Sequence, residues 1–343
     1  MKEFGSDFHF LPIQDNPIKT IGDHYPDATY YATGRQALID LYKKSEWKSL
    51  WVPEYFCYEV LDSLRKAGLK LKFYYDLPLN DEREELCLLP FKDGDALLRV
   101  NYFGLRSKRK NDKIPVPVIE DHTHDLIGNW VSNSDADWCF ASIRKSLPLP
   151  EGGILWSPKG MRLKEGPKLT AENVQLANRR WIAMKNKTAY LNGICDDKNT
   201  FRPDMISTEE QIGMIPLSSI DDKSLDYVNR FDIDAWFRKK KQNRELIKSD
   251  QFVHFVILES EDSSCYPFSL PLLFDTALAR EKCREYLIKK CIYPAVLWNV
   301  PQSSSPNVVD FSKRILSIHC DARYNVEDIL YIRDILADFQ FEI

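Results

Sequence analysis

A single lysine lies between an apolar run and a pair of glycines. Lys145 follows the aromatic and apolar segment Trp138–Ile143, which has the composition of a buried parallel strand. After two prolines, Gly152–Gly153 allow the chain to reverse tightly. An amine held at a strand end among apolar groups can have a lowered pKa and can form an imine with a carbonyl compound. Lys145 is therefore a candidate for covalent chemistry, whereas an isolated lysine is more often a solvated surface charge.

A cluster of ionisable residues follows another apolar run. Asp121 follows Val118, Ile119 and Glu120, and two histidines, His122 and His124, come after it. A purely structural strand end does not need so many ionisable groups, so the cluster is a second candidate for a functional site. The alternatives are a turn or cap aspartate and a satisfied pair of histidines. A metal site would need a further set of ligands at suitable spacing, which the sequence lacks, and we predict none.

The third candidate is the start of a helix. A short aromatic strand near Tyr30 runs through Thr33 and Gly34 into a segment whose apolar positions fall on one helical face. Thr33 is the predicted N-cap. A helix N-terminus presents free backbone N–H groups and the positive end of the helix dipole, which suits a phosphate. Many helices begin with Thr-Gly and bind nothing, so this signal depends on its context.

All three features lie just past predicted strands. Strands are predicted at 50–52, 69–75, 95–104, 116–121 and 138–143, with helical segments between them. Such an alternation favours right-handed crossovers and a mostly parallel sheet that binds ligands at its carboxyl edge. We therefore expect an α/β fold that brings Thr33–Gly34, Asp121 and Lys145 to one edge of the sheet.

The second half of the chain is more polar. Helices are predicted at 172–190, 232–247, 277–290 and 326–339, strands at 252–258 and 269–274, and a flexible loop at 300–307. We place a large domain with an N-terminal arm in residues 1–230 and a small α+β domain in residues 231–343.

Composition excludes several classes of protein. A net charge of -4, from 47 basic and 51 acidic residues, does not indicate a nucleic-acid partner, and the basic runs 106–110 and 238–241 are predicted to be solvated. No apolar stretch approaches the ~20 residues that span a bilayer, and the N-terminus lacks the apolar core of a signal peptide. We expect a cytoplasmic protein without a membrane partner. The eight scattered cysteines form no Cys-x-x-Cys pair and are predicted to be reduced and mostly buried.

Several segments together resemble the sugar aminotransferases of the DegT/DnrJ/EryC1/StrS family. Ile119–His124 is similar to the family's "EDxAH/Q" strand end, and Lys145 precedes Glu151–Gly153 at the same spacing as the family's cofactor lysine precedes "EGG". Ala32–Leu38 resembles the "GTxAL" helix start, and Val52–Pro53 the "vPxxTF" segment. The strands at 100–105 and 315–319 also have counterparts, so the resemblance spans most of the chain.

The resemblance implies a fold type I transferase that binds pyridoxal 5'-phosphate. Its large domain would hold a mostly parallel, seven-stranded sheet flanked by helices, with a small α+β domain at the C-terminus. Lys145 would form the aldimine and then act as acid and base, while Asp121 would pair with the pyridine N–H. The remaining cofactor-binding residues would be His124 near the phenolic oxygen, Gly34, Arg35 and Ser142 at the phosphate, and Phe56 stacked on the ring.

The sequence departs from the family pattern at three places. Phe140 replaces the usual serine five residues before the lysine, and the residues before Lys145 are Ser-Ile-Arg instead of His-Pro-Thr. Arg144 either supplies a missing phosphate donor or is a surface charge. The family segment that reaches the partner subunit's site is not evident, and residues 214–220 stand in its place. The substrate side of the site is therefore unassigned.

The function that we predict is transfer of an amino group from an amino acid, with glutamate as the expected donor, to a keto sugar that is nucleotide-linked. The resemblance also implies a homodimer. Two alternatives stay open: a protein of this fold that binds the cofactor for regulation or has lost turnover, and another fold type I enzyme such as a lyase or racemase.

Overall fold

The computed structural model of the chain describes residues 3–5, 7–13, 17–79, 86–111, 113–250, 252–260 and 263–340. Parts of the predicted N-terminal arm, at 1–2, 6 and 14–16, lie outside the described residues, as does residue 251 before the ninth strand. Within the described residues, no helix combines the length and apolar character needed to cross a membrane.

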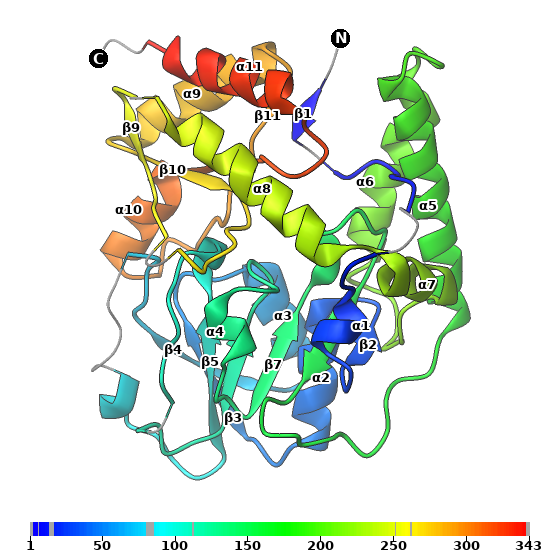
Figure 1. Cartoon of the computed structure of the whole chain (residues 1–343). Coiled ribbons are helices and arrows are strands. Elements are labelled where there is room, and N and C mark those ends of the chain that lie inside the picture. The colour runs from blue at the N-terminus through cyan, green and yellow to red at the C-terminus, as the bar shows by residue number, and fades with distance from the viewer. Residues whose placement is uncertain are drawn as a thin grey trace.

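A seven-stranded sheet forms the centre of the larger part of the molecule (Figure 1). Its strand order is β2-β8-β7-β6-β5-β3-β4. The strands from β7 to β4 are parallel to one another, and β8 runs antiparallel to both β2 and β7. The predicted mostly parallel sheet is confirmed. The strands are β2 Thr29–Tyr31, β3 Ser49–Pro53, β4 Lys70–Tyr74, β5 Asp95–Val100, β6 Val118–Asp121, β7 Trp138–Ala141 and β8 Gly153–Trp156.

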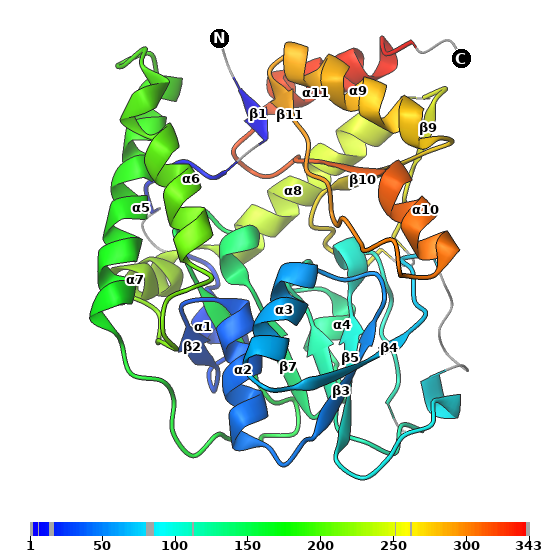
Figure 2. The same ribbon diagram turned by 180° about the vertical axis from the view of Figure 1, so that it is seen from behind.

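Helices cover both faces of this sheet, as the alternation of side chains along β7 shows. Phe140 packs in one core cluster with residues of α2 and α3, while Cys139 and Ala141 pack in another with residues of α5, α7 and α8. Figure 2 shows α2 and α3 on the face turned toward the viewer. The helices of this part are α1 Ile21–His24, α2 Gly34–Lys44, α3 Tyr58–Lys66, α4 Asn129–Ser132, α5 Ala171–Leu191, α6 Arg202–Gln211, α7 Asp222–Arg230 and α8 Ile233–Lys248.

The C-terminal part has its own core. Strand β10 lies between β9 and β12 in an antiparallel sheet, and this sheet packs against α9, α11 and the end of α8. The N-terminal strand β1 pairs with β11, so the first described residues are tied to this part of the molecule (Figure 1). The proposed boundary at residue 230 stays a prediction. The elements are β1 Phe4–Gly5, β9 Phe255–Ile257, β10 Leu270–Phe274, α9 Ala277–Lys289, β11 Ile292–Tyr293, α10 Pro306–Arg314, β12 Ile315–Ile318 and α11 Val326–Ala337.

Some sequence expectations were wrong. The helices α6, α7 and α10 had not been predicted, and α10 begins inside the segment expected to be a flexible loop, with Pro306 in its first turn. The two basic runs are not fully solvated, because Arg106, Arg109 and Lys240 are buried. Arg106 forms an ion pair with Asp76 at 2.6 Å, a partner that lies too far along the chain to be recognised from local charge patterns. Only four of the eight cysteines, Cys139, Cys265, Cys283 and Cys320, are buried.

Candidate active site

A cleft with about 560 Å³ of empty space lies where strands β5, β6 and β7 end and helix α2 begins. Parallel strands deliver the residues that follow them to a common edge, and the predicted convergence of three separate motifs is found here. The cleft is lined by all seven residues predicted to contact the cofactor: Gly34, Arg35, Phe56, Asp121, His124, Ser142 and Lys145.

Lys145 is held at the cleft by a short, firmly anchored segment. It ends the 3₁₀ helix Ile143–Lys145, which follows β7 directly, and Ile143 is fully buried. The next residue, Ser146, is fixed on two sides: its hydroxyl donates to the carbonyl of Thr123 at 2.9 Å, and its carbonyl accepts from Nε1 of Trp236 at 2.9 Å. The backbone at Lys145 therefore has little freedom to move away from the cleft.

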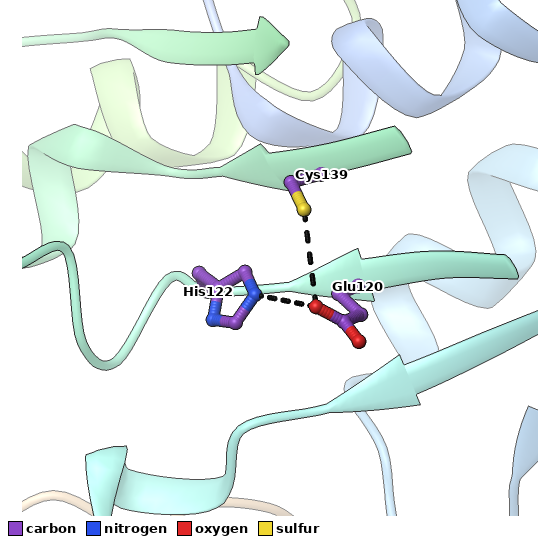
Figure 3. Close-up of side chains that lie close together, drawn as sticks. All are labelled: Glu120, His122 and Cys139. Carbon is purple, nitrogen blue, oxygen red and sulfur yellow. Dashed lines mark hydrogen bonds and ion pairs between the residues drawn. The ribbon is translucent and has the colours of Figure 1, made fainter. Parts of the chain in front are cut away.

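Asp121 faces the cleft because its neighbours occupy the opposite face of β6. Side chains alternate along a strand, so Glu120 points away from Asp121, as does His122 just past the strand. The Glu120 carboxylate accepts from Nε2 of His122 at 3.0 Å and from the Ser134 hydroxyl at 2.6 Å, and Cys139 lies beside it (Figure 3). This hydrogen-bonded cluster fixes the register that turns Asp121 toward Lys145.

The two histidines, His122 and His124, lie in different surroundings. Glu120, His122 and Cys139 have possible ligand atoms within 4.8 Å of one another, but the hydrogen bonds among them and to Asn111 account for the arrangement. Burial alone would raise the pKa of Glu120, yet the hydrogen bonds from His122, Ser134 and Asn111 hold it below its ordinary value. His124 lies apart from this group, in the cleft. The two histidines therefore do not form a shared site.

The Asp121 carboxylate is in an environment that favours a cationic partner. It is buried and accepts a hydrogen bond from the backbone N–H of Thr123 at 2.9 Å. Burial raises the pKa of Asp121, while the Thr123 hydrogen bonds and the charge of Lys145 act in the opposite direction. A buried carboxylate gains most from a partner that is positively charged and also donates a hydrogen bond.

Helix α2 begins at the cleft in close contact with two other segments. Thr33 is its N-cap, as predicted, and accepts from the backbone N–H of Gln36 at 3.3 Å. A Cβ at Gly153 would lie 2.3 Å from the carbonyl carbon of Thr33, and one at Gly34 would lie 3.0 Å from Cβ of Ser142. Position 153 therefore requires glycine, whereas a side chain at position 34 would fit only if Ser142 moved by a few tenths of an ångström.

Arg35 lines the cleft, and its side chain reaches α3. Its guanidinium lies 3.4 Å from the Ser63 hydroxyl and 3.5 Å from the Glu59 carboxylate, both on α3. The first turn of a helix contains backbone N–H groups that have no acceptor within the helix. The backbone N–H of Arg35 is one of these groups.

Aromatic rings form the wall opposite the strand ends. The His124 ring stacks on Phe268 at 4.6 Å and on Trp298 at 5.5 Å between centroids, and Phe56 lies 5.7 Å from Trp298. His124 accepts at Nδ1 from the backbone N–H of Phe103 at 3.0 Å. Burial, followed by the charges of Lys145 and Lys240, lowers the pKa of His124 to about 3. The ring is therefore neutral at pH 7 and carries its proton on Nε2, which makes it a hydrogen-bond donor.

Trp298 is a cleft residue that the sequence analysis missed. It comes from the C-terminal part, and the Tyr55 hydroxyl donates to the carbonyl of Leu297 beside it. No local pattern near residue 298 identifies it, because its place in the cleft depends on packing between residues more than 200 positions apart.

A second cavity adjoins the cleft and shares His124, Arg144 and Lys145 with it. Arg144 is not a surface charge, since its side chain is 10% exposed and it forms an ion pair with Glu209 on α6 at 2.7 Å. The cavity also draws residues from the N-terminal segment, α5, α6 and the C-terminal part: Asp7, Phe8, Arg180, Met184, Glu209, Phe268 and His319. It lies on the other side of Lys145 and is the candidate substrate pocket.

Comparison with solved structures identifies the fold. A protein described as a sugar aminotransferase from Streptococcus pneumoniae, in its PMP form, is 11% identical, and the match covers 97% of this chain and 93% of that one with a TM-score of 0.62. Helicobacter pylori PseC, an aminotransferase of pseudoaminic acid biosynthesis, is 14% identical over 98% of both chains with a TM-score of 0.63.

A DegT DnrJ EryC1 StrS aminotransferase from Brucella abortus matches 92% of this chain and 87% of that one, at 13% identity and a TM-score of 0.55. No protein-family model matches the sequence, and no curated protein matches it. The chain thus has the fold of the sugar aminotransferases, which is the fold type I architecture predicted from its motifs. At these identities the likeness defines the fold, and the chemistry must be argued from the site.

Proposed function

We propose that the protein is a pyridoxal 5'-phosphate-dependent aminotransferase that transfers an amino group from an amino acid to a keto sugar. Glutamate is the expected donor, and a nucleotide-linked sugar is the expected acceptor. The observation that supports this most strongly is the convergence of Lys145, Asp121 and the N-terminus of α2 on one cleft. Three motifs that are distant in sequence line the same cleft, within a fold that solved sugar aminotransferases share.

The lining of the cleft suits the two ends of this cofactor. The phosphate would lie at the start of α2, with the backbone of Gly34 and Arg35 and the Ser142 hydroxyl as donors. The glycine at position 34 keeps the helix start open to a ligand, because the chain already approaches Ser142 closely there. The pyridine ring would lie between Asp121 and the aromatic wall, with Phe56 and His124 as neighbours.

Pyridoxal 5'-phosphate, when bound, supplies an aldehyde that reacts with amines and a ring that accepts electrons. Lys145 would provide the amine for the covalent link and, once released, would carry a proton to and from the reacting carbon. Asp121 would hold a proton on the ring nitrogen through a charge-assisted hydrogen bond. The Nε2–H of His124 would donate to the phenolic oxygen, which its neutral state permits.

The same proposal includes a homodimer, since the sites of the resembling family lie between subunits. The segment at 214–220, which replaces a family segment that reaches the partner's site, packs within its own chain. The carbonyls of Ile215 and Pro216 accept from the Gln36 side chain at 3.3 and 2.9 Å.

Mixing the purified protein with glutamate tests the function. Conversion of the cofactor from its pyridoxal to its pyridoxamine absorbance, together with release of 2-oxoglutarate, is the expected result. Cofactor absorbance without conversion by any amino-acid donor would instead support a binding or regulatory protein. Loss of carbon dioxide or racemisation of the amino acid would indicate a lyase or racemase. A strictly monomeric protein in analytical ultracentrifugation would contradict the predicted dimer.

A further inference from the structure

Two arginines hold one carboxylate at the second cavity. Arg144 donates from both terminal nitrogens to Glu209, with Nη2 to Oε1 at 2.7 Å and Nη1 to Oε2 at 2.9 Å. Nη1 of Arg180 lies 2.7 Å from Oε2 of the same carboxylate. Arg144 thus binds the carboxylate in the bidentate geometry that guanidinium groups favour, while Arg180 lies against the same carboxylate as an ion pair without hydrogen-bond geometry. The two arginines form a fork around Glu209.

Burial is unequal between the two sides of this cluster. The side chains of Arg144 and Arg180 are 10% and 5% exposed, whereas that of Glu209 is 45% exposed. In addition, Nε of Arg144 is buried without a hydrogen-bond acceptor among the described residues. The cations are therefore fixed parts of the cavity wall, and the carboxylate reaches them from the solvent side on a flexible side chain.

The acidic side chains beside the fork are more exposed than its two arginines. Glu209 serves both guanidinium groups, and the carboxylate of Asp7 lies 3.6 Å from Arg180 and is 46% exposed. Burial lowers the pKa of Arg180, as does the charge of Arg144 beside it. Two buried cations at close range are stabilised by any anion that can replace or join Glu209.

The fork also lies where a substrate must bind. Arg144 directly precedes Lys145, and both residues line the cleft and the second cavity. An anion on the fork therefore lies in a cavity that Lys145 also lines. A carboxylate fits better than a phosphate, because the fork already binds the two coplanar oxygens of Glu209.

We propose that Arg144 and Arg180 bind a carboxylate of the amino-acid donor, and that Glu209 occupies this position in the empty protein and is displaced when the donor binds. The inference rests on the proposed function, since an amino acid reacting at Lys145 is what brings a carboxylate to this cavity. Glu209 thus keeps the buried arginines paired between turnovers.

Glutarate, a dicarboxylate that cannot donate an amino group, is the probe. Its affinity is measured by calorimetry on the full-length protein with and without pyridoxal 5'-phosphate. Arg180→Gln should weaken binding about tenfold or more, as expected for losing a hydrogen bond to a charged group. Glu209→Gln should tighten binding several-fold, because the neutral amide competes less well for the arginines.

Arg179→Gln is the matched control. Arg179 lies next to Arg180 on the same helix, but its guanidinium is 43% exposed and pairs with Asp204 at 2.7 Å, outside the second cavity. Its removal should leave glutarate affinity unchanged. Circular dichroism and melting temperature establish that each variant is folded, and Glu209→Gln still tests the site should Arg180→Gln fail to fold.

Each part of the proposal has an outcome that overturns it. Equal glutarate affinity in Arg180→Gln and Arg179→Gln would contradict the binding of the carboxylate by the arginines. If Glu209→Gln binds glutarate no more tightly than the parent protein does, the displacement of Glu209 is contradicted. Phosphate binding in preference to glutarate through the same residues would overturn the assignment to a carboxylate. If glutarate binding follows the expected pattern but no cofactor attaches to the protein, the proposed function fails instead.

Discussion

The two cavities that meet at Lys145 are built in different ways. The cofactor cleft is formed mostly by residues that directly follow strands or begin a helix, between positions 33 and 145. The second cavity combines residues from the N-terminal segment, α5, α6 and the C-terminal part. The first is a product of regular topology and the second of long-range packing. This difference teaches that the motifs of a candidate cofactor site can be recognisable in a sequence while the candidate substrate side follows no recognisable motif.

Substitution of Asp121 should weaken cofactor binding in the cleft and leave glutarate binding in the second cavity unchanged. Asp121→Asn removes the charge that would hold the proton on the ring nitrogen, so cofactor affinity should fall by about 2–5 kcal/mol. Titration with pyridoxal 5'-phosphate, followed by absorbance, measures the loss. Glutarate affinity should stay within about 0.5 kcal/mol of the parent, because independent sites are additive to that extent.

Asp62→Asn serves as a control for the loss of one acidic charge, since Asp62 is 60% exposed and pairs with Arg65 on the surface. Unchanged cofactor affinity in Asp121→Asn would contradict its assignment as the partner of the ring nitrogen.

Glu151 belongs to the lysine motif but lines neither cavity, so it can be compared with the residues of both cavities. Its carboxylate accepts from the backbone N–H of Asp221 at 2.6 Å, and burial raises the pKa of Glu151 to about 8. The folded protein therefore holds a proton on Glu151 that the unfolded chain releases above its ordinary pKa of 4.5. Between about pH 4.5 and 8 this group should make stability fall as pH rises, by up to about 1.4 kcal/mol per pH unit.

Glu151→Gln keeps an oxygen for the Asp221 N–H and cannot ionise, so it should remove this pH dependence. The variant should be more stable than the parent at pH 8 and close to it at pH 4, as measured by urea unfolding. A difference between the two proteins that is the same at both pH values would contradict the raised pKa of Glu151.

The smallest effect is expected at Arg35, whose side chain contacts Ser63 and Glu59 on α3. Arg35→Gln removes contacts to Glu59 and Ser63 on α3 but keeps the N–H that a phosphate would use. Cofactor affinity should change by less than about 0.5 kcal/mol, which is the range of substitutions away from key contacts. Spectroscopic titration checks this, and a large loss would show that the guanidinium itself binds the phosphate.

The cofactor cleft could be predicted from sequence because each of its signals is local. Lys145 and Asp121 directly follow apolar runs that form β7 and β6, and Thr33 precedes a helix with a clear apolar face. Parallel topology then requires these residues to meet at one edge. The role of Gly153 was only partly predictable: a turn was expected, whereas its contact with the Thr33 backbone required coordinates.

The substrate side could not be predicted because its contacts join distant parts of the chain. Arg180 and Glu209 lie on different helices, one of which, α6, had not been predicted. Their relation to Arg144 depends on how both helices pack beside the strand that carries the lysine. Charged residues on polar helices are usually solvated, so no local pattern distinguishes Arg180 from its exposed neighbour Arg179.

The central claim is that Lys145 attaches the cofactor, and one measurement tests it most directly. The parent protein, mixed with pyridoxal 5'-phosphate and then reduced with borohydride, should show the absorbance of a lysine adduct and carry the corresponding added mass on Lys145 in peptide mass spectrometry. Lys145→Ala should lose both signals while remaining folded. A colourless parent protein, or an adduct that persists on another lysine in Lys145→Ala, would contradict the account.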